Sequence, residues 1–171
     1  MSQATGKVKW CLKKAEKEIA EKGMHRGLVK VDEDLGLAKK HLAKAEHNLL
    51  AAIYFDKGGF SDWSAPAFFY TIYHCFLAIT RRFGYESRNQ ECTIALVEML
   101  NEEGRIKLDK KFIDTLKITK AEDIHEDKVV SLRESFQYNV NIEFKEREKF
   151  DVMLNLCKEA INQTKNIVLK E

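Results

Sequence analysis

The sequence predicts an all-α protein, an up-and-down helical bundle of four to five core helices with additional short helices. Apolar residues recur every three to four positions along several stretches, which is the spacing of one helix face. The 171 residues include one proline and eight glycines, and no run alternates Val, Ile or Thr in the manner of a strand. We expect a single domain over 1–171, with a core in 32–171 and an accessory N-terminal helix in 1–30.

The bundle is expected to form around residues 63–83, WSAPAFFYTIYHCFLAITRRF, which carry no charge from 65 to 80. A helix that is apolar on nearly every side is typical of a buried central helix. Ser64 is the expected N-cap, with Pro66 in the first turn, and Gly84 is expected to end the helix. The uncharged run is shorter than the roughly 20 residues that a bilayer requires, so we expect no membrane span.

The remaining helices follow from apolar periodicity and from capping residues. They are expected at 7–22, 32–57, 90–103, 109–120, from 123 or 127 onward, and at 145–169. Asn89 is a favourable N-cap for the helix at 90–103, and Gly104 is its expected terminator. In the central helix we expect Phe69, Phe76 and Ile79 to be fully buried.

A polar strip interrupts the apolar surface of the central helix. At 100° per residue Tyr70, Thr71, His74, Ala78 and Arg81 share one side, with Arg82 at its edge. One interpretation is a core histidine beside a surface arginine pair, and the other is a pocket for a phosphate and a base. Together with the loop that follows and a second Arg/Tyr pair, the candidate ligand-binding residues are Tyr70, His74, Arg81, Arg82, Arg88, Asn89, Arg133 and Tyr138.

No other motif points to chemistry. The five histidines lack the helical spacing of a metal site, and there is no glycine-rich phosphate loop or nucleophile elbow. The four cysteines contain no CxxC pair and suggest no disulfide framework. We therefore expect no metal, no cofactor and no catalytic residue. A net charge of +2 does not indicate a nucleic-acid-binding protein by itself, and the lack of a signal-peptide pattern favours a cytoplasmic location.

The order of features in AKAEHNLLAAIYFDKGGFSDWSAPAFFYTIYHCFLAITRRFGY resembles the HEPN domains (higher eukaryotes and prokaryotes nucleotide-binding). A helix with an Ala/Leu stripe, a short glycine turn and an aromatic-rich helix ending in glycine and a polar loop carry the resemblance. It covers residues 36–100 and extends more weakly to 133–138 and the last helix. The resemblance implies a homodimer, a nucleotide or RNA ligand, and partnership with a small nucleotidyltransferase.

The ribonucleases of that family use an arginine followed by four to six residues and a histidine, and the chain lacks this pattern. Tyr138 occupies the position where a four-residue spacing after Arg133 would place the histidine. A tyrosine, with a pKa of about 10, is a poor substitute for histidine near neutral pH. We therefore expect a non-catalytic module. The alternatives are a metal-independent ribonuclease that uses Arg88 or Arg133 with the remote His74, and a structural oligomerisation protein.

Overall fold

The computed structural model of the chain describes residues 2–117, 129, 133–134 and 147–170. Its elements are α1 (Gln3–Lys22), β1 (Leu28–Lys30), α2 (Leu35–Lys57), the 3-10 helix η1 (Ser61–Trp63), α3 (Ser64–Arg82), β2 (Tyr85–Ser87), α4 (Gln90–Glu102), α5 (Lys110–Leu116) and α7 (Arg147–Val168). Helices dominate, and two three-residue strands make the only sheet in this part of the chain. The predicted all-α class is confirmed.

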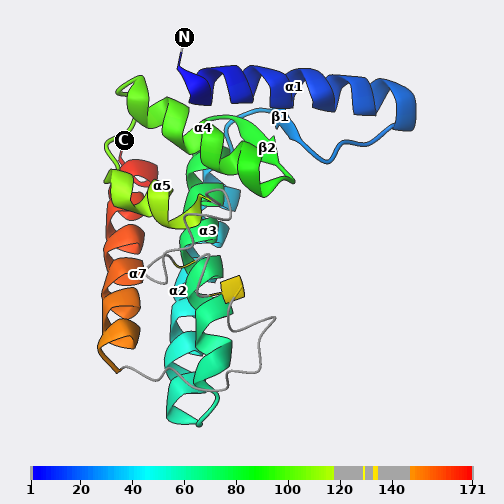
Figure 1. Cartoon of the computed structure of the whole chain (residues 1–171). Coiled ribbons are helices and arrows are strands. Elements are labelled where there is room, and N and C mark those ends of the chain that lie inside the picture. The colour runs from blue at the N-terminus through cyan, green and yellow to red at the C-terminus, as the bar shows by residue number, and fades with distance from the viewer. Residues whose placement is uncertain (1, 118–128, 130–132, 135–146, 171) are drawn as a thin grey trace.

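Helices α2, α3 and α7 stand side by side and form the upright part of the bundle (Figure 1). The expected antiparallel hairpin of α2 and α3 is present, and Gly59 supplies its turn with a φ of 80°. Two ion pairs join α7 to α2, Lys165 to Glu46 and Arg147 to Asp56, each at 2.5 Å.

Helices α1 and α4 lie across one end of the upright helices, with the small sheet between them and α3 (Figure 1). In the sheet β1 and β2 run antiparallel, and Val29 lies opposite Glu86. The sequence did not predict these strands, because three residues are too few for an alternating pattern to stand out. Backbone hydrogen bonds extend the pairing at both ends, from Val31 N–H to Gly84 O at 3.0 Å and from Arg88 N–H to Gly27 O at 2.9 Å.

One continuous apolar core contains residues of α1, α2, α3, α4, α5 and α7. Phe69, Phe76 and Ile79 of α3 are at most 1% exposed, as predicted for the central helix. Helix α1 contributes Val8 and Cys11 to the same core, and both are buried. The N-terminal helix is therefore packed into the domain and is more than an appendage on its surface.

Several predicted helix ends differ from the structure. Helix α2 begins at Leu35, because the side chain of Asp34 accepts a hydrogen bond from Leu37 N–H at 2.8 Å and caps the helix. Ser64 is not an N-cap, because η1 runs directly into α3 and the Ser64 hydroxyl donates to Ala52 O at 2.7 Å. Asn89 caps α4 as predicted, by accepting from Cys92 N–H at 3.0 Å.

Other predicted boundaries also differ. Helix α1 starts at Gln3, before the expected 7, and helix α5 ends at Leu116, before the expected 120. Helix α7 covers Arg147–Val168, and its expected start at 145 lies outside the described residues. The helix expected from 123 or 127 onward lies largely outside the described residues.

The expectation of no disulfide was wrong. Cys11 of α1 and Cys92 of α4 form a disulfide bond, while Cys75 and Cys157 are free and buried. The two bonded residues are 81 positions apart, so their pairing depends on how α1 and α4 cross, which spacing in the sequence does not reveal.

Among the described residues, no helix has the length and hydropathy needed to pass through a bilayer.

Candidate functional site

The predicted polar strip of α3 is only partly present. Tyr70 is exposed, and His74 and Arg81 are half-buried, so these three residues do line one edge of the helix. Thr71 and Ala78 are fully buried instead. Thr71 turns its hydroxyl to Ala67 O at 2.8 Å, which satisfies the group inside its own helix and allows burial.

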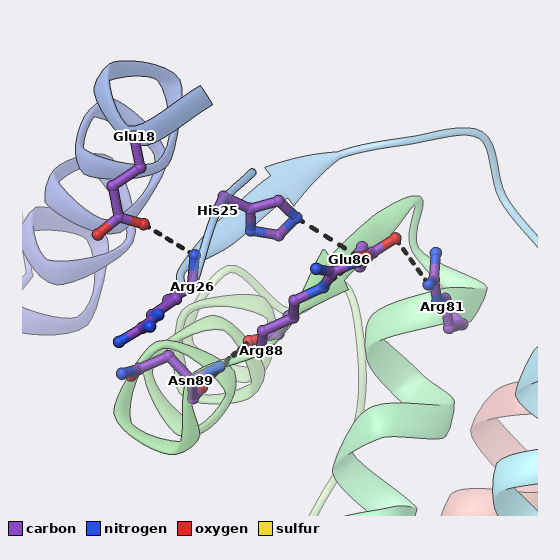
Figure 2. Close-up of polar contacts among 8 residues, drawn as sticks. Glu18, His25, Arg26, Arg81, Glu86, Arg88 and Asn89 are labelled. Carbon is purple, nitrogen blue, oxygen red and sulfur yellow. Dashed lines mark hydrogen bonds and ion pairs between the residues drawn. The ribbon is translucent and has the colours of Figure 1, made fainter. Parts of the chain in front are cut away.

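Arg81 and Arg88 come together as predicted, but they meet on a carboxylate (Figure 2). Arg81 Nη2 and Arg88 Nε each lie 2.9 Å from a Glu86 oxygen, and His25 Nε2 approaches the same side chain at 3.5 Å. Burial alone would raise the pKa of Glu86, but hydrogen bonds and charge from Arg81 and then Arg88 outweigh it and lower the pKa. Glu86 therefore remains ionised and offsets one of the two positive charges.

The other residues near this arginine cluster also have structural partners. Arg26 N–H donates to Glu18 at 2.8 Å, and Asn89 is the helix cap described above (Figure 2). Arg82 points elsewhere and pairs with Glu33 at 2.6 Å. His25 is buried, and its Nδ1 has no hydrogen-bond partner. Arg133 lies 3.6 Å from Glu134, so all four of the predicted ligand arginines already contact carboxylates.

His74 has a partner that spacing in the sequence could not indicate. Its Nδ1 lies 3.1 Å from Nδ1 of His41, which belongs to α2. Burial, followed by the charges of His41 and Lys44, lowers the pKa of His74 to about 4. Burial and then the charge of Arg81 lower the pKa of His41 as well. Both imidazoles are therefore neutral at pH 7.

Of the second predicted pair, Arg133 and Tyr138, the structure describes only Arg133. The Arg133 guanidinium lies 4.1 Å from the centre of the Phe69 ring, a cation–π contact on the central helix. Tyr138, its predicted neighbour in a site, lies outside the described residues. Arg88 is bound to Glu86, and Arg133 lies over Phe69. Neither of these contacts involves His74, so neither supports the ribonuclease alternative.

A cleft of about 590 Å³ opens where α3 and α7 end beside the loop between α4 and α5. Its cationic side chains are Arg82, Arg105, Lys107 and Lys170, and among the described residues of the lining Asp109 is the only carboxylate. Of the predicted site residues only Arg82 belongs to it. This cleft is the candidate functional site.

The arginines of the cleft are partly neutralised, whereas its lysines are not. Arg105 lies 3.8 Å from Glu103 and 5.2 Å from the centre of the Phe83 ring. Arg82 is paired with Glu33, as described above. Lys107 and Lys170 are exposed, and neither forms an ion pair with another described residue. The two lysines therefore supply the uncompensated positive charge.

Amide side chains add hydrogen-bonding groups to the same cleft. Gln163 donates to the Asp109 carboxylate at 2.7 Å and accepts from Asp109 N–H at 2.9 Å, so these two residues hold each other in place. Asn166, one turn further along α7, also lines the cleft. A fixed carboxylate, a free amide and several cations are the groups that bind a base, a ribose and a phosphate.

Sequence reasoning missed Arg105, Lys107, Asn166 and Lys170 because they lie in two segments about sixty residues apart. One signal was available, since Arg105 and Lys107 directly follow the helix terminator Gly104. That signal also has a structural explanation, because cations are favoured at the negative ends of helices.

Comparison with protein-family models gives no match, and comparison with curated proteins gives none at a significant level. Fold and site therefore define this protein as a small all-α bundle with an α1–α4 disulfide and a cationic cleft at the end of α3.

Proposed function

We propose that this protein is a HEPN-like module that binds a nucleotide or RNA without cleaving it, and that the phosphate lies in the cationic cleft. The observation that carries the proposal is the pair of lysines, Lys107 and Lys170, which form no ion pair with a described residue and line a cleft whose described residues include one carboxylate. Lysine and arginine attract phosphate, and Arg105, stacked over Phe83, offers a flat face to a base.

The competing explanation is that the cations only compensate helix ends. Helices α3 and α7 both end at the cleft, and each C-terminus carries a partial charge of about −0.5. A purely structural role predicts no ligand and a loss of stability when the lysines are removed. A binding role predicts that a ligand binds and that removal of the lysines leaves the stability nearly unchanged.

The experiment measures binding of labelled single-stranded RNA and of ATP and GTP at several salt concentrations. The Lys107→Ala/Lys170→Ala variant should bind RNA more weakly. The slope of log K against log salt should fall by about 1.4, because each phosphate contact to a single strand contributes about 0.7. The melting temperature should change little, because exposed charges contribute little stability.

Two matched control variants test whether the loss of RNA binding comes from the cleft. Lys22 and Lys57 are exposed lysines in the last turns of α1 and α2, so Lys22→Ala/Lys57→Ala removes the same charge from helix ends outside the cleft. Arg81→Ala/Arg88→Ala tests the arginine cluster at Glu86. The proposal is abandoned if wild-type protein binds none of these ligands, or if the cleft variant binds as tightly as wild type.

The homodimer and the nucleotidyltransferase partner belong to the same proposal and rest on the resemblance. Exposed aromatic side chains around the α2–α3 turn support a paired surface, namely Tyr54, Phe60 and Trp63, each more than half exposed. Light scattering should report twice the mass of one chain at micromolar concentration. A monomer throughout that range would remove the dimer.

The cytoplasmic location is also a proposal, and the disulfide provides its test. Disulfides are rare in the reducing cytosol. If the protein is cytoplasmic, Cys11 and Cys92 should be thiols in protein trapped by alkylation directly from cells. A quantitatively bonded pair in that sample would assign the protein to an oxidising compartment.

A further inference from the structure

Two histidines face each other across the α2–α3 contact, away from the residues that line the cleft. Nδ1 of His41 and Nδ1 of His74 are 3.1 Å apart, and the rings are tilted by 32°. Both side chains are half-buried, so the two packed helices restrict their rotation. Neither residue has a role in the proposed phosphate site.

A neutral imidazole has one N–H, so each ring carries its proton either on Nδ1 or on Nε2. If the two Nδ1 atoms form a simple hydrogen bond, one of them carries a proton and the other presents a lone pair. If both rings instead carry their protons on Nε2, two lone pairs converge on one point. A cation at that point removes the repulsion between them.

We propose that His41 and His74 bind one divalent transition-metal ion, such as Zn²⁺ or Ni²⁺, through their Nδ1 atoms. Two nitrogens bound tetrahedrally to zinc, at about 2.0–2.1 Å each, are about 3.3 Å apart. The observed 3.1 Å is close to that separation, so binding needs only small rotations of the rings. One ring changes tautomer, and no net proton is released.

The surroundings determine the strength of the site. The described residues contain no group of three or more His, Cys, Asp or Glu side chains that could hold a metal, so solvent or an external anion completes the coordination. Lys44 and Arg81 act on the two rings and weaken the binding of a cation, although Glu86 pairs with Arg81 at 2.9 Å. We therefore expect a site that exchanges its metal, unlike a closed structural site with four protein ligands.

The test is calorimetric titration of the whole protein with Zn²⁺ and with Ni²⁺ at pH 7.0. Wild type should bind one equivalent of either metal. His41→Ala and His74→Ala should each weaken binding by more than the ~10–100-fold that loss of an outer-shell partner alone costs. His47→Ala, which removes an exposed histidine from the same helix as His41, should bind like wild type.

Imidazole NMR spectra give a second readout, which identifies the histidines that bind the metal. Substoichiometric Ni²⁺ should broaden the His41 and His74 resonances before those of His25, His47 and His125. The proposal fails if wild type binds no equivalent, if both alanine variants bind unchanged, or if His47→Ala loses as much affinity as they do.

Discussion

The disulfide between α1 and α4 allows a prediction of its contribution to stability. Cys11 and Cys92 are 81 residues apart, and a cross-link of that span restricts the unfolded chain. The chain-entropy relation gives a contribution of about 4.5 kcal/mol to the free energy of unfolding. Reduction removes this term and leaves every other side chain in place, so it measures the cross-link alone.

The assay compares urea and thermal unfolding with and without a phosphine reductant. At about 2–4 °C per kcal/mol for a chain of this size, reduction should lower the melting temperature by roughly 9–18 °C. The Cys11→Ala/Cys92→Ala variant should show no further change on reduction. Because both cysteines are buried in the core, this variant also loses some packing and should be at least as unstable as reduced wild type.

A count of thiols in denaturant shows whether the disulfide is present in each sample. Oxidised protein should expose two thiols, Cys75 and Cys157, and reduced protein four. If the oxidised form counts two thiols and still unfolds within about 1 kcal/mol of the reduced form, the entropic argument is wrong. If four thiols appear before reduction, the bond does not form under those conditions.

Three further predictions concern the core, the histidine pair and a helix cap. Phe76→Ala should cost about 3–5 kcal/mol in urea unfolding, because Phe76 is fully buried, whereas a loss under about 1 kcal/mol would refute its central position. The folded-state pKa of His74 lies below its unfolded value, so the unfolded chain binds more protons below pH 6.5. Urea midpoints should therefore fall as the pH drops from 6.5 towards 4, and His74→Asn should show a shallower fall, while identical profiles would exclude this cause. Asn89→Ala should cost about 1 kcal/mol through loss of the α4 cap, and an unchanged midpoint would contradict the capping role.

Local signals in the sequence were sufficient for the helices and much of the core. The apolar period of α3 placed Phe69, Phe76 and Ile79 correctly, because helical geometry repeats within a few residues. Gly84, expected to end α3, has a φ of 75°. A Cβ there would also lie 2.9 Å from Val31 O, so the close approach of Val31, the residue after β1, is a further reason for glycine, and only the fold reveals it.

The candidate sites were less predictable, because their residues come from distant segments. Sequence reasoning grouped Arg81 and Arg88, but Glu86 lies between them and neutralises part of their charge. Of the predicted ligand-binding residues, only Arg82 borders the cleft. The remaining cations of that cleft follow Gly104 or end α7, where the sequence alone predicts nothing beyond helix-end charge.

The sequence by itself therefore determined the all-α class, the central helix and the Asn89 cap, since each depends on interactions within about four residues. The tertiary structure decided which distant groups meet: β1 with β2, Cys11 with Cys92, and His41 with His74. Those contacts depend on the angles at which packed helices cross and on the rotation of each helix about its axis. Side-chain packing over the whole core sets these angles, and no short stretch of sequence encodes them.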